Sequence, residues 1–353
     1  MQTPTGSVPD RPVPDRSPIP LGSRDAAPAI RAKALSKFYR NPWTLKVTRG
    51  LEDLSLELPR GEVMGYLGPN GAGKTTTLKL LTGLLKPTSG GAWLLGESIE
   101  HPSSRRRLGF LPEQPYFYDY LNGMEYLVMA GRLSGLQSHD AHRQAKLWLG
   151  RVGLGDRPAL KLRKYSKGML QRLGLAAALV HRPELLILDE PMSGLDPFGR
   201  RDVRDLILEQ KHLGVTVLFS SHILPDVELL CDRVAIVLEG RLSRVATVAE
   251  IVHGASQRIE ISCASDAALE IPPAWRRALY REERPQGALY VLEQDALLDE
   301  VLPWLASSGA QVRSVVPHRN SLETLLLAEA GGKSQVAPRD AIESEAPEQR
   351  RSA

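Results

Sequence analysis

The sequence has little of three features that would place it in other protein classes. Of its 353 residues only two are cysteines, Cys231 and Cys263, so a disulfide framework is excluded, and their neighbours offer neither metal-ligand spacing nor a catalytic partner. No apolar run approaches the roughly 18 residues of a membrane-spanning helix. The chain starts without the apolar segment of a signal peptide, so we expect a cytoplasmic protein. The net charge of +4 comes with both signs interspersed, which indicates a mixed, solvated surface.

The strongest indication of function is a glycine-rich segment with the pattern G-x-x-x-x-G-K-[ST]. It follows the apolar run 63–67 and precedes a helix-forming stretch, 75–85, which is the context that a phosphate-binding loop requires. Its glycines let backbone N–H groups turn toward phosphate oxygens, and the helix N-terminus adds a favourable dipole. Lysine provides a charge for the β- and γ-phosphates and threonine a hydroxyl for the metal. The segment predicts binding of a nucleoside triphosphate by Gly68, Pro69, Asn70, Gly71, Ala72, Gly73, Lys74, Thr75 and Thr76.

A second motif follows a continuous apolar run that begins at Leu185 and ends in two carboxylates. The run predicts a buried central strand whose carboxyl end lies at the edge where open α/β sheets bind ligands. Asp189 is placed there to hold Mg²⁺, directly or through water. Glu190, one residue further, is placed to orient or deprotonate an attacking water.

Between these motifs, Ser166 is a good N-cap residue in front of a helical apolar run that reaches Val180. Its hydroxyl and the free N–H groups of that helix form a second anion site. Together with the nearby Asp-Glu pair, this segment resembles the L-S-G-G-Q signature of ATP-binding cassette (ABC) ATPases. Ser166 and Gly168 match the serine and second glycine, whereas Tyr165, Lys167 and Met169 depart from the pattern.

Other elements resemble the same family in the same order along residues 30–245. Gln114 matches a glutamine that contacts the metal and senses the γ-phosphate, and His222 matches a histidine that contacts the γ-phosphate. The loop that crosses the dimer interface corresponds to Ser193, Gly194, Leu195 and Asp196. Tyr39 occupies the position of the aromatic residue that stacks on adenine; Phe38 and Trp43 are weaker alternatives.

The resemblance implies an α/β fold: a P-loop NTPase core of the ABC ATPase type with an antiparallel β subdomain and a helical subdomain. We expect the ATPase domain at 29–245, with the helical subdomain at about 115–165, and a small α+β domain at 250–331. The Pro-rich arm 1–28 and the tail 332–353 are expected to be disordered, since such composition cannot bury enough apolar surface.

Local patterns add expectations for single elements. Leu54, Leu56 and Leu58 alternate with polar residues as in a half-buried strand. Asn122 and Glu125 have the spacing of a capping box. A surface hairpin is expected at 41–50, and the chain is expected to leave the ATPase core after Gly240. Beyond that point we predict strands at 257–261, 288–292 and 311–316 and a helix at 295–305. A short closing helix is predicted at 321–327. It resembles the end of the C-terminal extension in bacterial type-2 ABC exporter ATPases.

The resemblance implies an ATPase that uses ATP and Mg²⁺ and couples hydrolysis to export through a separately encoded transmembrane permease. Two copies would enclose two nucleotides, with Ser166, Lys167, Gly168 and Met169 of each chain acting on the nucleotide of the other. Such a subunit works at the cytoplasmic face of the inner membrane as a peripheral protein.

Two other functions compete with export. The first is a soluble ABC ATPase that acts on nucleic acid or ribosomes, but such members usually carry two cassettes or long coiled coils. This chain has one cassette and no sustained heptad pattern, so no nucleic-acid partner is expected. The second is a nucleotide-binding regulator without turnover, which the presence of both Glu190 and His222 disfavours.

Overall fold

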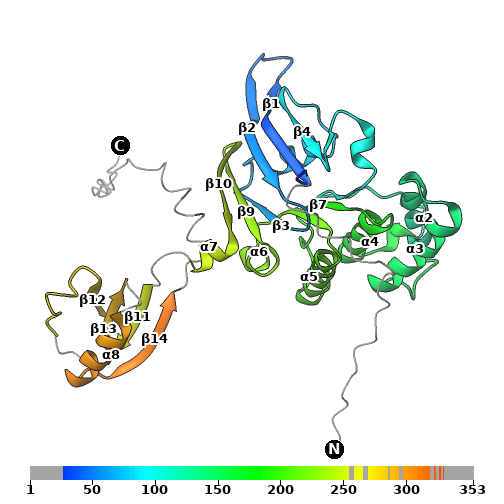
Figure 1. Ribbon diagram of the computed structural model, residues 1–353. Coiled ribbons are helices and arrows are strands. Elements are labelled where there is room, and N and C mark those ends of the chain that lie inside the picture. The colour runs from blue at the N-terminus through cyan, green and yellow to red at the C-terminus, as the bar shows by residue number, and fades with distance from the viewer. Residues whose placement is uncertain are drawn as a thin grey trace, which may run out of the picture.

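The computed structural model describes most of the chain between residues 27 and 329. The described residues are 27–253, 258–264, 269–284, 287–293 and 297–318, with Leu322, Leu326 and Glu329. Within them the chain forms a central sheet, an antiparallel sheet beside it and a C-terminal sheet (Figure 1). The predicted arm 1–28, apart from Ala27 and Pro28, and the predicted tail 332–353 lie outside the described residues.

The central sheet has the strand order β10-β9-β3-β8-β7-β6, and all pairings except the antiparallel β9–β10 pair are parallel. Its strands are β3 (Val63–Leu67), β6 (Leu108–Leu111), β7 (Leu185–Asp189), β8 (Thr216–Ser220), β9 (Arg233–Leu238) and β10 (Arg241–Thr247). All five residues of β7 are buried, as in a parallel strand covered on both faces. The expectation that the chain leaves the core after Gly240 was wrong, because β10 pairs with β9 as far as Thr247.

The two faces of this sheet pack into two cores. Alternate residues such as Leu186 and Leu188 pack with α4 (Lys167–Leu179), α5 (Pro197–His212), α6 (Leu224–Leu230) and α7 (Val248–His253). Their neighbours, such as Leu185 and Ile187, pack with α1 (Lys74–Leu81) and the antiparallel sheet. The predicted helix 75–85 is shorter than expected because Thr82 caps it and Gly83 turns the chain with a φ of 72°.

The antiparallel sheet has the order β2-β1-β4-β5, with β1 (Ile30–Arg40), β2 (Val47–Leu58), β4 (Ser89–Leu94) and β5 (Glu97–Ser98). Leu54, Leu56 and Leu58 are buried, so the predicted half-buried strand is confirmed. The hairpin predicted at 41–50 is shorter than expected, because β2 already begins at Val47.

The helical region between β6 and β7 contains α2 (Gly123–Leu133), α3 (Ser138–Arg151) and the short 3₁₀ turn η2 (Leu162–Lys164), followed by α4. Another 3₁₀ turn, η1 (Pro102–Arg105), precedes β6.

The capping box at the start of α2 is confirmed. Glu125 N–H donates to Asn122 Oδ1 at 2.9 Å, and Asn122 N–H donates to Glu125 Oε2 at 2.8 Å. The bond from Asn122 N–H lowers the pKa of Glu125.

The C-terminal sheet has the order β12-β13-β11-β14, with β11 (Arg258–Cys263), β12 (Leu279–Arg284), β13 (Gly287–Leu292) and β14 (Val312–His318). Helix α8 (Leu298–Ser307) covers one face, where Trp304 packs edge-on against Tyr290 and Trp275. Pro303 lies inside α8. The three predicted strands are confirmed, and β12 is an additional strand.

The predicted closing helix lies mostly outside the described residues. Leu322 and Leu326, which belong to it, are helical. They pack into the core that contains α6 rather than against the C-terminal sheet, and Leu322 N–H donates to Glu228 Oε1 at 2.9 Å. The division into an ATPase domain at 29–245 and an accessory domain at 250–331 therefore stays a prediction. None of the described helices has the length and apolar character needed to cross a membrane.

Candidate functional site

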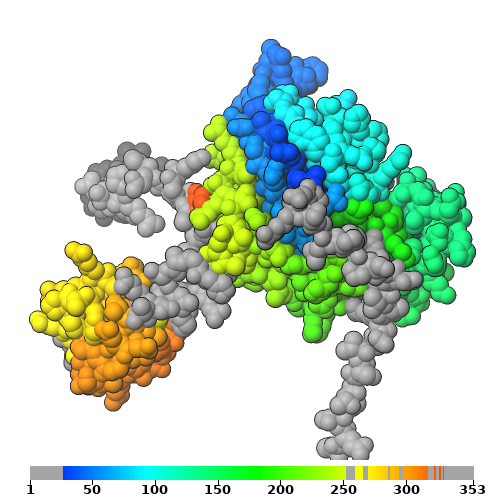
Figure 2. Space-filling model, in the orientation of Figure 1, coloured from blue at the N-terminus to red at the C-terminus, as the bar shows by residue number. Residues whose placement is uncertain are grey.

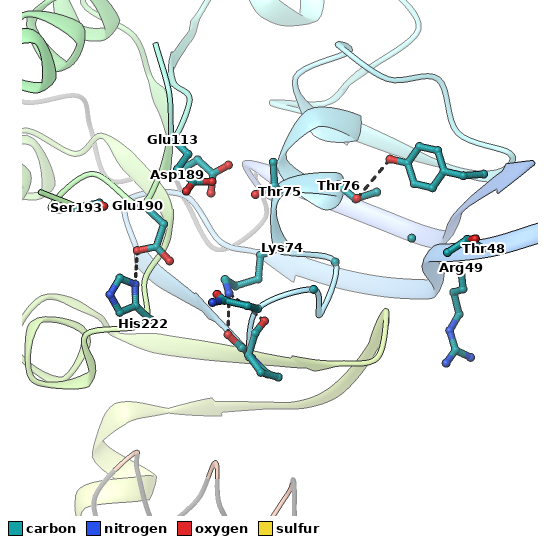
Figure 3. Close-up of a pocket in the computed structure, with 17 residues that line it drawn as sticks. Thr48, Arg49, Lys74, Thr75, Thr76, Glu113, Asp189, Glu190, Ser193 and His222 are labelled. Atoms are coloured by element: carbon teal, nitrogen blue, oxygen red, sulfur yellow. Dashed lines mark hydrogen bonds and ion pairs between the residues drawn. The ribbon is translucent and has the colours of Figure 1, made fainter. Parts of the chain in front are cut away.

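An open cavity of about 860 Å³ lies where β3, β7 and β8 end (Figure 3). The carboxyl ends of parallel strands share one edge of a sheet, so loops far apart in sequence meet there. The cavity is lined by Tyr39, Thr48, Arg49, Gly50, Gly68, Pro69, Asn70, Gly71, Gly73, Lys74, Thr75, Thr76, Glu113, Asp189, Glu190, Ser193 and His222.

The predicted phosphate loop connects β3 to α1 and forms the floor of this cavity. Gly73 has a φ of 101°, and a Cβ there would lie 2.5 Å from the carbonyl oxygen of Gly50, so only glycine fits. Lys74 is almost buried, and its Nζ donates to the carbonyl oxygens of Gly68 at 2.7 Å and Pro69 at 3.2 Å. Of the predicted loop residues, Ala72 alone does not line the cavity; it is buried in the core shared with the antiparallel sheet.

The two predicted carboxylates lie side by side at the end of β7, but in different surroundings. Asp189 is 2% exposed, and Ser220 Oγ donates to its Oδ1 at 2.6 Å. Glu190 has a φ of 50°, a strained value for this residue type, and its carboxylate Oε2 lies 2.8 Å from Nδ1 of His222 (Figure 3). The structure therefore holds Asp189 fixed in a buried position and joins Glu190 to His222.

Ser220 is a functional residue that sequence reasoning missed. Besides donating to Asp189, its Oγ accepts a hydrogen bond from Glu190 N–H at 2.9 Å, so one hydroxyl bonds both the Asp189 carboxylate and the backbone of Glu190. The only signal in the sequence is a serine at the end of an apolar strand, which is common.

We predict that Ser220→Ala lowers the unfolding free energy by about 1–3 kcal/mol, because it removes the bond to the buried Asp189 Oδ1 and leaves the partly buried Glu190 N–H without its partner. ATP turnover should also fall, because Asp189 loses the bond that orients it. The matched control is Thr216→Val on the same strand. The Thr216 hydroxyl accepts a hydrogen bond of 2.8 Å from Gly61 N–H and does not line the cavity. Chemical unfolding and ATPase assays of both variants test this: equal turnover in the two variants would contradict a role for Ser220 in the site.

One wall of the cavity comes from the base of the β1–β2 hairpin. Tyr39 lines it, and its hydroxyl lies 3.4 Å from Oγ1 of Thr76. Trp43, a weaker alternative for the adenine contact, is 91% exposed and lies away from the cavity; Phe38 does not line it either.

Arg49 also lines the cavity, and it was not predicted as a site residue from the sequence. Its guanidinium donates to Glu52 Oε2 at 2.8 Å. Hydrogen bonds from Arg241 and then Arg49 lower the pKa of Glu52 to about 2.

The predicted signature lies at a separate cavity of about 360 Å³, lined by Ser166, Gly168, Arg172, Gly194, Leu195, Asp196, Phe198, Gly199 and Asp202. Ser166 caps α4, since its Oγ accepts from Met169 N–H at 3.3 Å. The side chain of Lys167 lies against Gly194, and Met169 packs against the core. Ser166 and Gly168 do not line the first cavity, whereas Ser193 does. The loop Ser193–Asp196 thus joins the two cavities.

The first cavity also offers oxygen ligands for a metal ion. The Thr75 hydroxyl and the Asp189 carboxylate line it, and oxygen ligands are those that Mg²⁺ prefers. Gln114, a predicted ligand, is exposed and does not line the cavity, whereas its neighbour Glu113 does. Within the described residues no group of three or more His, Cys, Asp or Glu could hold a metal ion.

Comparison with known proteins identifies the family. Residues 51–193 match the ABC transporter family. The chain is 38% identical to an ABC transporter ATP-binding protein of Nostoc, over 89% of this chain and 93% of that protein. It is 33% identical to the daunorubicin/doxorubicin resistance ATP-binding protein DrrA of Streptomyces peucetius, over 86% and 92%.

Solved structures agree with this assignment. An ATP-binding subunit of an ABC transporter, 32% identical, superposes with a TM-score of 0.57 over 64% of this chain and 92% of that chain. A dimeric ATP-binding cassette bound to ADP and phosphate, 22% identical, shares the fold with a TM-score of 0.58 over 62% and 98%. The resemblance and the fold class predicted from the sequence are confirmed. The chain belongs to the ABC transporter ATP-binding proteins and is an ATPase.

Proposed function

We propose that the chain is the ATP-hydrolysing subunit of an exporter, bound to a separate transmembrane permease at the cytoplasmic face of the inner membrane. The observation that carries the catalytic part is one cavity at the strand ends that combines Lys74, Thr75, Asp189 and Glu190, with His222 bonded to Glu190. Export is supported by the names of relatives: DrrA, the bacitracin transport protein BcrA of Bacillus licheniformis, 40% identical, and the linearmycin resistance protein LnrL of Bacillus subtilis, 36% identical.

In this proposal the protein residues position the triphosphate and a water molecule. Lys74 and the N–H groups of residues 68–76 bind the phosphates, while Tyr39 stacks on the base. Glu190 orients the attacking water and accepts its proton, and the contact with Nδ1 of His222 holds the carboxylate in place. Mg²⁺, held by Thr75 and Asp189, would neutralise charge that develops on the phosphates.

The separation of the two cavities supports a homodimer. Ser166 and Gly168 present a helix N-terminus, an anion site, yet they line a different cavity from Lys74 in the same chain. A second copy facing the first would bring its Ser166 to the open side of the phosphate cavity. Ser193, in the loop that joins the two cavities, would lie at this contact.

We predict that Ser166→Arg impairs turnover but leaves ATP binding by the monomer largely unchanged, because Ser166 acts on the nucleotide of the other subunit. Mixing this variant with Lys74→Ala should restore part of the activity, since one hybrid site then has an intact phosphate loop and an intact signature. If Ser166 only capped its own helix, the variant would lose about 1 kcal/mol of stability and little turnover. Loss of ATP binding by isolated Ser166→Arg would contradict action in trans.

The export function itself is tested by purification of the tagged chain from membranes. We expect a multi-span membrane protein to co-purify and to change the ATPase rate, and we expect nucleic acid or ribosomes to leave that rate unchanged. Stimulation by ribosomes or nucleic acid, without a membrane partner, would favour the soluble alternative.

A further inference from the structure

The hairpin tip, residues 40–47 between the paired parts of β1 and β2, exposes apolar side chains that the nucleotide site does not use. Trp43 is 91% exposed, Leu45 61% and Val47 58%. The tip projects beyond the neighbouring strands in Figure 1, and its blue surface stands at the rim of the molecule in Figure 2. Gathered apolar side chains at such exposure are typical of an interaction site.

The backbone of the hairpin tip is well defined by hydrogen bonds. Asn41 Oδ1 accepts from the N–H groups of Trp43 at 2.8 Å and Thr44 at 3.0 Å. Asn41 N–H also donates to Lys46 O, and Leu45 N–H donates to Asn41 O, both at 2.9 Å. Leu45 keeps a positive φ of 56° in this turn. The turn thus holds the side chains of Trp43 and Leu45 outward rather than letting them fold back onto the sheet.

The charge around these apolar side chains has one sign. The segment 37–51 contains four basic residues, Lys37, Arg40, Lys46 and Arg49, and no acidic residue. Arg49 pairs with Glu52, but Arg40 and Lys46 are exposed and take part in no ion pair among the described residues. A partner of this surface must therefore accept an aromatic ring and carry negative charge.

We propose that the hairpin tip docks onto an anionic lipid surface, with Trp43 and Leu45 at the depth of the headgroups and Arg40 and Lys46 beside the lipid phosphates. Tryptophan is enriched at the membrane interface, and basic side chains next to it are attracted by anionic lipids. This proposal rests on the proposed transport function only in that both place the chain at a membrane. Because Tyr39 and Arg49, at the base of the same hairpin, line the nucleotide cavity, docking at the tip also restrains one wall of that site.

The test is sedimentation of the full chain, without nucleotide or permease, with vesicles of phosphatidylcholine alone or mixed with phosphatidylglycerol. We expect binding to the mixed vesicles that weakens with salt. Lys46→Glu should lower the partition coefficient about 30-fold, at roughly fivefold for each of the two charges that change. The double variant Trp43→Ser, Leu45→Asn should lower it about tenfold or more. Asparagine tolerates the positive φ of Leu45, so the turn is kept.

The matched control is Leu133→Ser, at a side chain that is 82% exposed at the end of α2, which should bind the vesicles like the unmodified chain. Failure of the unmodified chain to sediment with the mixed vesicles would overturn the proposal. Equal sedimentation of the double variant would do the same. If the double variant bound the vesicles normally but no longer bound a detergent-solubilised permease, the partner of the hairpin tip would be a protein instead. Since the assay contains neither ATP nor permease, its failure is distinguishable from failure of the proposed transport function.

Discussion

Glu190→Gln is expected to reduce ATP turnover by about 10²–10⁴-fold, the usual contribution of a general base, while ATP stays bound. The amide has nearly the shape of the carboxylate but cannot accept the proton of the attacking water. The bound nucleotide should then hold two subunits together, so the variant should elute as a dimer in ATP and as a monomer without it. Size-exclusion chromatography and steady-state ATPase rates measure both effects.

Glu113→Gln is the matched control, because Glu113 lines the same cavity but lies outside β7, whereas in the described part of the chain it is Glu190 that bonds to His222. We expect that control to retain most of its turnover. A Glu190→Gln variant that hydrolyses ATP at an undiminished rate would exclude Glu190 as the base. If Glu113→Gln lost turnover while Glu190→Gln kept it, the assignment between the two carboxylates would have to be reversed.

The features that could be predicted from the sequence depend on residues close together in the chain. The phosphate loop, the N-cap at Ser166 and the capping box of Asn122 and Glu125 each need only a few consecutive residues with the right spacing. Leu54, Leu56 and Leu58 alternate with polar residues, and this period of two predicts a strand with one buried face from the local sequence alone.

The features that were missed depend on residues brought together by the fold. Ser220 lies 31 residues from Asp189 in sequence, and their bond exists only because β7 and β8 are neighbours in the sheet. Gln171 Nε2 donates to the carbonyl oxygen of Pro191 at 3.0 Å, which joins the signature helix to the segment after Glu190, and no local pattern indicates this contact.

Two further differences have local physical reasons. Strand β12 has a charged sequence, Leu-Tyr-Arg-Glu-Glu-Arg, which hides its period; as an edge strand it tolerates these charges by pairing them, Arg281 with Glu283 and Arg284 with Glu282. Gln114 follows the end of β6 and is exposed, so its family position did not place it in the cavity, whereas Glu113 lies there.

Lys74→Ala is expected to abolish ATP binding in a titration, with a rise in Kd of about 100-fold or more. Lys74 Nζ is the one side-chain cation in the loop 68–76, and each hydrogen bond from a charged donor contributes about 1.5–3 kcal/mol, so two bonds to phosphates account for that factor. The backbone N–H groups and the helix N-terminus remain, so the variant should fold. Lys79→Ala, on the exposed side of the same helix α1, is the control for a general loss of positive charge and should bind ATP normally. Near-normal affinity of Lys74→Ala, with unfolding behaviour unchanged, would mean that the triphosphate does not lie in this loop.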